Sequence, residues 1–354
     1  MSGSQVGLWA ASRLPECKRA DRETGRPEGS IAGLDLEGFC GTTRLATKPG
    51  MKLRDEVIGR DREGGERVVS WRNAVTEWRD WYKTSKKSAL VLESPDGDEI
   101  TKPATNRFMP SEKKRLYAKL NDLERGVKSE YDNLSTAFLT FSASTQSGAG
   151  AWNRSPANHL SDVLGSWSAV RRELNRALEG RDWEYMRMLE PHTGGSGRVS
   201  ATGYAHVHVG VFVDGPISEA MFTGALEAHV RNCDAAGSDA HTPERALELA
   251  KVGDLAAYLS KYLMKYDGEG PLEAPGHVQQ FNALLWATGR RRWSVSDGAQ
   301  AWMASPEPER DELELEPVAI EIGDARYPLS DRDRSPVMRP IRGEPGVDPP
   351  PLRE

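Results

Sequence analysis

The chain has 354 residues, of which 38% are hydrophobic and 28% are charged, and this balance predicts a folded protein with a substantial core. No run of about eighteen apolar residues occurs, and the three cysteines, Cys17, Cys40 and Cys233, lack CxxC spacing. These features exclude a membrane span, a disulfide framework and a zinc ribbon, so we expect a cytoplasmic protein without a membrane partner. The net charge of −6 argues against a generally basic nucleic-acid-binding protein, although acidic residues concentrate after residue 306 and basic clusters precede it.

The first third of the chain divides into two segments. Residues 1–65 are rich in Gly, Arg, Asp and Glu without sustained periodicity, and we expect them to be poorly ordered. Residues 66–135 are predicted to form a helical N-terminal segment. Its first helix covers residues 68–82, where tryptophans recur at helical spacing, and its second begins with an N-cap at Ser111.

Residues 136–270 alternate between strand and helix patterns and are predicted to form the main domain. The pattern predicts strands at 137–143, 183–190, 204–213 and 246–252, and helices at 159–179, at 218–231 and from Asp254 onward. This βαββαβ order followed by a helix predicts an α+β fold of the split-βαβ, ferredoxin-like kind, an antiparallel sheet with helices on one face. Residues 271–305 are predicted to be a helical, basic extension, and residues 306–354 a disordered, acidic, proline-rich tail, so both termini are expected to be flexible.

Two histidines in the third predicted strand are candidate metal ligands. Successive side chains of a strand alternate between its faces, so His206 and His208 point to one side and the intervening valines to the other. Two ligands are too few to hold a divalent cation firmly. Glu190 is the candidate third ligand, because a hairpin brings the end of one strand beside the next. Two imidazoles and a carboxylate suit Mn²⁺ or Mg²⁺, whereas the alternative reading is a histidine pair without a metal.

The helix predicted after Asp254 carries two tyrosines four residues apart. Its leucines form a buried stripe on a helical wheel, and Tyr258 and Tyr262 lie on the border between this stripe and two lysines, Lys261 and Lys265. A phenol is a weak nucleophile when protonated, and a nearby cation can activate it. Tyrosine and lysine are also common in amphipathic helices without catalytic function, so this pattern indicates a catalytic helix only in combination with the histidines. Tyr266 falls over the leucine stripe and is expected in the core.

The histidine strand and the tyrosine helix together resemble motifs of the HUH endonucleases. The run GYAHVHVGVFV ending at Val213, followed by AYLSKYLMKY over residues 257–266, is similar to the second and third motifs of two-tyrosine rolling-circle replication initiators. The resemblance extends over about residues 107–303 and is closest to initiators of haloarchaeal plasmids and viruses. A HIT-type nucleotide hydrolase also carries alternating histidines on a strand, but Gly210 occupies its third position here.

The resemblance implies a fold, a reaction and a set of partners. It implies an HUH nuclease domain that nicks origin DNA, single-stranded or locally melted, through a 5′-phosphotyrosine intermediate, with Tyr258 and Tyr262 as nucleophiles. It also supports Glu190, because related initiators carry a glutamate on the strand before the HxH strand. No G-x-x-x-x-G-K-[ST] loop occurs, so a host helicase and a host DNA polymerase are the implied partners.

Two further groups of residues are candidates for DNA contact. The first predicted strand resembles the initial motif of the family, in which Thr140 and Ser142 would help to contact DNA, although a buried strand alone also explains its composition. A basic and aromatic run suggests a patch that contacts phosphates and stacks bases, with a solvated helix end as the alternative. This patch consists of Arg290, Arg291, Arg292 and Trp293.

Two other functions remain open at the level of sequence. A transposase or conjugative relaxase of the HUH class would use the same chemistry on a different substrate. A non-catalytic DNA-binding repressor on the same fold would need neither the metal nor the tyrosines. The lysines beside both tyrosines favour the catalytic interpretation.

Overall fold

The computed structural model describes most of the predicted nuclease domain and parts of its flanking segments. The described residues are 58–60, 66–68, 71–145, 155–192, 202–250, 270–303 and 316–329. The predicted tyrosine helix, with Tyr258, Lys261, Tyr262, Lys265 and Tyr266, lies outside them. Among the described residues, no helix is long and apolar enough to cross a membrane.

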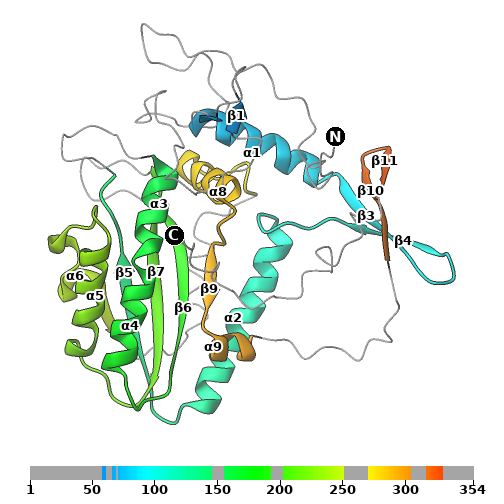
Figure 1. Cartoon of the computed structure of the whole chain (residues 1–354). Coiled ribbons are helices and arrows are strands. Elements are labelled where there is room, and N and C mark those ends of the chain that lie inside the picture. Colours follow the sequence, from blue (N-terminus) through cyan, green and yellow to red (C-terminus); the bar gives the residue numbers. More distant parts are fainter. Residues whose placement is uncertain are drawn as a thin grey trace, which may run out of the picture.

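The centre of the molecule is a five-stranded antiparallel sheet with the order β8-β5-β7-β6-β9 (Figure 1). Its strands are β5 (Leu134–Phe141), β6 (Trp183–His192), β7 (Thr202–Asp214), β8 (Leu247–Ala250) and β9 (Trp293–Val295). The predicted α+β class and the antiparallel sheet are therefore confirmed. The edge strand β9 falls in the segment that the sequence predicted to be helical and basic.

One face of this sheet, called here the first face, carries the main hydrophobic core. Val207, Val209 and Val211 of β7 point into it, because they alternate with the histidines along the strand. Among the described residues, six helices contribute to this core, and Figure 1 shows α3 and α4 lying along the strands. They are α1 (Trp71–Ser85), α3 (Pro156–Gly165), α4 (Trp167–Ala177), α5 (Ala220–Asn232), the single turn α6 (Pro243–Ala246) and α8 (Gly276–Thr288).

The single helix predicted over residues 159–179 is two helices in the structure. Ser166 is both the C-cap of α3 and the N-cap of α4, and its hydroxyl donates a hydrogen bond to the carbonyl of Val163. The chain turns away after α4 at Gly180, which has a φ of 77° that glycine adopts without steric cost. The helical region therefore ends before Gly180, as the sequence predicted, but the sequence did not predict the break at Ser166.

The opposite face, called here the second face, has a smaller apolar cluster of its own. Phe138, Met186 and Phe212 line it on neighbouring strands. The helices α2 (Pro110–Glu130) and α9 (Asp297–Trp302) cover this cluster, α2 through Leu120, Leu123 and Val127. The expected helices on one face are thus joined by two on the other, because these three apolar side chains must also be removed from water.

The start of α2 differs from the prediction. The N-cap is Met109, which makes no side-chain cap hydrogen bond, and Ser111 lies inside the helix. Pro110 occupies the first turn, where its fixed φ suits a helix and its missing N–H costs no intrahelical hydrogen bond. The proline therefore sets the helix start one residue before the predicted serine cap.

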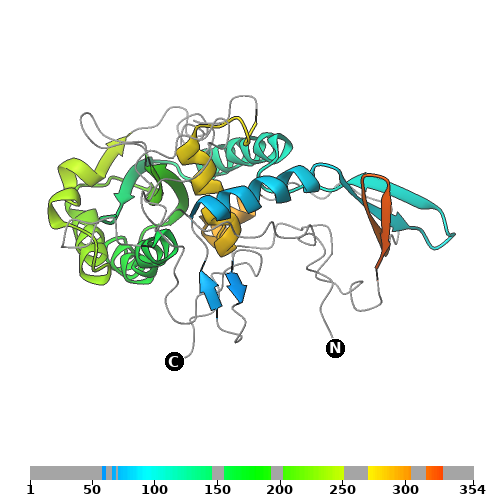
Figure 2. The same cartoon turned by 90° about the horizontal axis from the view of Figure 1, so that it is seen from above.

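A second sheet of four strands stands away from the first, at the right in Figures 1 and 2. Its order is β11-β10-β3-β4, with all pairs antiparallel. The strands are β3 (Ser88–Glu93), β4 (Glu99–Pro103), β10 (Glu316–Ile322) and β11 (Ala325–Pro328). Residues 316–328 are ordered here although the prediction placed them in a disordered tail, and residues 88–93 and 99–103 are strands within the segment predicted to be helical.

The pairing of β10 with β3 explains both corrections. Ala319 and Ile320 of β10 lie opposite Val91 and Leu90 of β3, and Val91 and Ala319 are almost fully buried. This burial joins segments more than two hundred residues apart, so neither local composition nor periodicity could reveal it. A two-stranded hairpin of β1 (Ile58–Arg60) and β2 (Glu66–Val68) similarly extends order into the segment that was predicted to lack it.

The contact between α2 and α9 gives a stability prediction. A methyl group added at Gly126 of α2 would lie 2.4 Å from Cγ of Trp302, so Gly126→Ala should destabilise the protein by about 1–3 kcal/mol. Gly224 of α5 is the matched control, since its added Cβ meets only Glu173 at ordinary distances and Ala should stabilise the helix by about 0.5–1 kcal/mol. Urea unfolding measures both, and equal signs for the two variants would contradict the packing of α9 on α2.

Candidate metal centre

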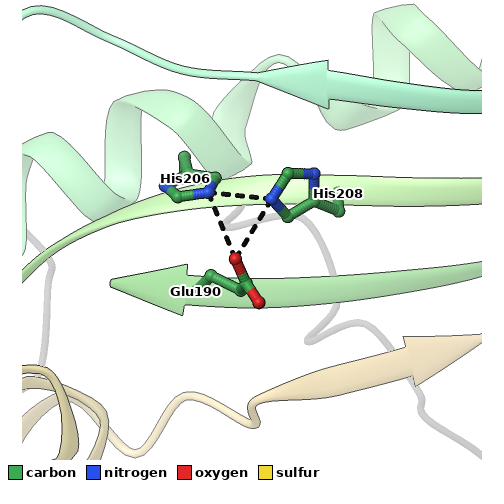
Figure 3. Close-up of side chains that lie close together, drawn as sticks. All are labelled: Glu190, His206 and His208. Carbon is green, nitrogen blue, oxygen red and sulfur yellow. Dashed lines mark hydrogen bonds and ion pairs between the residues drawn. The ribbon is translucent and has the colours of Figure 1, made fainter. Parts of the chain in front are cut away.

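The three predicted metal ligands lie together on the second face of the central sheet. The register of β6 and β7 places Glu190 opposite His206 and Met188 opposite His208. The two histidines, two residues apart, share a face of β7, and Glu190 points to the same face of β6 (Figure 3). The hairpin arrangement therefore brings the carboxylate and the two imidazoles into one cluster, as the sequence predicted.

The ligand atoms of this cluster are close to one another. Oε2 of Glu190 lies 3.5 Å from Nε2 of His206 and 3.3 Å from Nε2 of His208. The two Nε2 atoms are 2.8 Å apart. Ligand atoms around a cation bound at about 2.1 Å lie roughly 3.0–3.4 Å from one another, and the three separations lie within about 0.2 Å of this range.

Burial makes the charge of this cluster costly unless it is balanced. Only 2% of Glu190 is exposed, and its Oε1 has no hydrogen-bond partner among the described residues. Burial raises the pKa of the Glu190 carboxyl, but hydrogen bonds and charges from His206 and His208 outweigh this effect and lower the pKa to about 2. The carboxylate is therefore ionised at neutral pH, with one oxygen available to a further ligand.

The donor set fits a divalent cation. Two Nε2 atoms at 2.8 Å can both direct lone pairs to one point only if a cation occupies it, since otherwise one of them must carry a proton. Two neutral imidazoles and an ionised carboxylate would hold such an ion and leave coordination positions for other oxygen ligands. The residues present thus match the group that the sequence motif predicted, and Mn²⁺ or Mg²⁺ remains the proposed identity.

The predicted DNA-contacting residues of β5 lie beside this cluster. Thr140 is opposite His208, and its Oγ1 is 3.0 Å from Nδ1 of that histidine. Ser142 follows the end of β5, where its backbone N–H donates to Nε2 of His241 at 3.1 Å and its carbonyl accepts from Nε2 of His229 at 2.9 Å. DNA contact by either residue stays a prediction, while the structure gives each of them a hydrogen bond to a histidine.

The predicted basic and aromatic patch is spread over different surroundings. The guanidinium of Arg292 lies 5.8 Å from the centre of the Phe281 ring, and the carbonyl of Arg290 accepts a hydrogen bond from Arg107. Arg291 is exposed. Trp293 belongs to β9, where it pairs with Met188 and packs partly buried against the apolar cluster of the second face. DNA contact by these four residues also remains a prediction.

A buried polar network that the sequence did not reveal adjoins the end of β5. His229 of α5 is fully buried, with its Nδ1 2.7 Å from the hydroxyl of Ser166. The ring of His241 lies 4.7 Å from that of His229 between ring centres, and its Nδ1 donates to the carbonyl of Gly237. The network joins residues up to about a hundred positions apart, and nothing in their local patterns signals it. It fixes the backbone of Ser142 and therefore the end of β5.

The fold and the donor set define an α+β protein with a candidate divalent-metal centre on its central sheet. A family model described as "Putative rep protein (DUF1424)" matches residues 43–326, and the chain belongs to this family. Since a rep protein is a replication protein, membership indicates a role in replication.

Two proteins of Halobacterium are similar to this chain over most of their length. An "Uncharacterized 36 kDa protein" of Halobacterium salinarum is 38% identical over 284 residues, which cover 76% of this chain and 86% of the relative. A protein with the same description from Halobacterium sp. (strain GN101) is 38% identical over 293 residues, covering 76% and 87% respectively. No solved structure matches the chain.

The cluster predicts direct binding of a divalent cation. Titration calorimetry with Mn²⁺ should detect one site in the wild type, and His206→Ala, His208→Ala or Glu190→Gln should weaken it at least about 100-fold, because each removes a ligand. Glu184→Gln is the matched control, since it neutralises a carboxylate on the same face of β6 but about 20 Å away along the strand. Equal affinities for all four variants and the wild type would exclude this site.

The buried network predicts a loss of stability in mild acid. Burial lowers the pKa of His229, the hydrogen bond to Ser142 raises it and His241 lowers it further, leaving a pKa of about 4. An unfolded histidine titrates near 6.5, so the unfolded chain alone takes up this proton between about pH 6.5 and pH 4. The contribution of neutral His229 to the free energy of unfolding is therefore fully present well above pH 6.5 and falls as the pH drops towards 4, by on the order of 3 kcal/mol.

Urea unfolding at several pH values measures this effect. His229→Gln retains an amide donor for the Ser142 carbonyl but removes the titrating group. The variant should be less stable than the wild type at pH 7.5 and should lose less stability than the wild type between pH 7 and pH 5. Parallel pH profiles for the two proteins would show that His229 does not titrate as described.

Proposed function

We propose that this protein is a rolling-circle replication initiator of the HUH type, a metal-dependent, site-specific endonuclease and strand-joining enzyme for single-stranded DNA. The observation that carries the proposal is the cluster of Glu190, His206 and His208 on adjacent strands, in a chain that belongs to a rep family. Membership in the rep family supports a role in replication, and the Glu-His-His cluster supports metal-dependent chemistry. The proposed setting is the cytoplasm of a host cell that carries a plasmid or virus genome.

The proposed reaction is a transesterification. The phenolic oxygen of Tyr258 or Tyr262 attacks an origin phosphorus and its proton passes to a base or to solvent, while the bond to the 3′ oxygen breaks and that oxygen takes up a proton from an acid or from solvent. The products are a 5′-phosphotyrosine and a free 3′-hydroxyl. A divalent cation held by the cluster would polarise the scissile phosphate and offset the charge that develops on its oxygens.

The protein side chains supply positioning and charge. Glu190, His206 and His208 project from the two longest strands of the central sheet, and a cation that they hold would fix the place of the phosphate. Lys261 and Lys265 would stabilise the phenolate or hold the DNA, since each follows a tyrosine by three residues on the predicted helix.

The second tyrosine would allow replication to terminate. After one round of synthesis by a host polymerase, it would attack the regenerated junction, and the 3′-hydroxyl released by that attack would displace the first tyrosine and close a circle. Each step exchanges one phosphodiester for another, so no nucleotide cofactor is required. A host helicase would separate the strands.

Two alternatives differ in what they require of the metal centre. A DNA-binding repressor on the same fold has no need for a buried carboxylate that faces two imidazole nitrogens, and burying that charge is costly. The cluster therefore favours an enzyme. A transposase or relaxase would use the same cluster, and the rep family favours replication over these two.

A nicking assay on single-stranded origin DNA tests the proposal. The wild type should form a covalent adduct that requires Mn²⁺ or Mg²⁺ and is abolished by EDTA. The double variant Tyr258→Phe with Tyr262→Phe should form none, while each single variant should retain some cleavage, because the remaining phenol can reach the same phosphate.

Tyr266→Phe is the matched control and should nick like the wild type, since its predicted position lies over the leucine stripe. Mass spectrometry of digested adducts identifies the tyrosine that carries the nucleotide. An adduct that persists in the double variant, or one found on Tyr266, would refute the assignment of the nucleophiles.

A further inference from the structure

We propose that Thr140 is a positioning residue for the metal centre, acting through Nδ1 of His208. This inference rests on the proposed function, because it presumes that the cluster binds a cation. It differs from the role that the sequence suggested for Thr140, which was contact with DNA. In this role the Thr140 hydroxyl holds the His208 ring so that Nε2 faces Glu190 and His206.

The geometry of three neighbouring strands places this hydroxyl. β7 lies between β5 and β6 in the sheet, so His208 has Thr140 on one side and Met188 on the other. Oγ1 of Thr140 is 3.0 Å from Nδ1 of His208, and the opposite ring nitrogen, Nε2, is 3.3 Å from the Glu190 carboxylate. The ring thus bridges a hydroxyl on one strand and the ligand cluster on the other.

A hydroxyl is suited to this place because it both donates and accepts. When Nε2 carries the ring proton, Nδ1 is an acceptor and the threonine O–H donates to it. When Nε2 uses its lone pair for a cation, the ring proton resides on Nδ1, and the hydroxyl turns to accept it. The hydrogen bond at 3.0 Å can therefore persist in both states, and the ring need not reorient when the ion binds.

The position of Thr140 is itself fixed from several directions. Its neighbours on β5, Leu139 and Phe141, are buried in the core of the first face. Two residues later, the backbone of Ser142 is held by His229 and His241 through its carbonyl and its N–H. A side chain on so constrained a strand end can orient its partner, as the second hydrogen bond of a metal-ligating histidine commonly does.

Three variants separate the hydroxyl from the shape of the side chain. Thr140→Val keeps the branched shape and removes the hydroxyl, whereas Thr140→Ser keeps the hydroxyl. Thr136→Val is the matched control, because Thr136 lies on the same strand and the same face, four residues away and opposite Phe212. Circular dichroism and thermal unfolding without metal establish that each full-length variant is folded.

Calorimetric titration with Mn²⁺ is the test. Thr140→Val should bind Mn²⁺ about 10–100-fold more weakly than the wild type, Thr140→Ser should stay within about threefold, and Thr136→Val should not change. If Thr140 had only a structural role, its variants would change the unfolding temperature, and Thr140→Ser would not bind Mn²⁺ more tightly than Thr140→Val. Wild-type affinity in Thr140→Val, or equal weakening in the valine and serine variants, would overturn the inference.

The outcome also distinguishes this inference from the proposed function. If the wild type binds no divalent cation, the metal centre itself fails and the role of Thr140 fails with it. If the wild type binds Mn²⁺ and loses it in His208→Ala but not in Thr140→Val, only the positioning role is wrong.

Discussion

The register between β6 and β7 is the constraint on which the site depends. Glu190 meets the two histidines only because it pairs with His206, and a slip of one residue would turn it to the first face, among the valines of the core. The alternation of β6 resists such a slip, since Tyr185 and Leu189 of this strand would leave the core of the first face and lose their burial. The hydrophobic core thus fixes the geometry of a polar cluster that lies on the opposite side of the sheet.

The second face of the sheet is divided along the strands. At one end Phe138, Met186 and Phe212 are covered by α2 and α9, and at the other end the same strands carry Thr140, His208 and Glu190. This division lets one sheet combine a second apolar cluster with a charged centre. A buried carboxylate is costly by itself, and the two imidazoles beside it make its ionised form accessible. The same arrangement predisposes the cluster to take up a cation, so stability and ligand binding are linked.

Helix α2 and strand β9 show how flanking segments serve the central domain. Both lie outside the residues that the sequence assigned to the nuclease fold, yet each packs on it, α2 through Leu120 and Leu123 and β9 by pairing with Met188. The match of the family model to residues 43–326 includes these segments as well as β3, β4 and β10 of the second sheet. The family match therefore extends well beyond the split-βαβ core, and the core is covered in part by residues outside 136–270.

The sequence by itself indicated the strands β5, β6, β7 and β8 and the sharing of one face by His206 and His208, because both follow from local periodicity. It also indicated Glu190, since a hairpin is a short-range structure. Only the tertiary structure placed Thr140 against His208, buried His229 beside Ser166, and paired β10 with β3. These contacts join residues that are distant along the chain, and their energies come from burial and hydrogen bonding that exist only once the chain has folded.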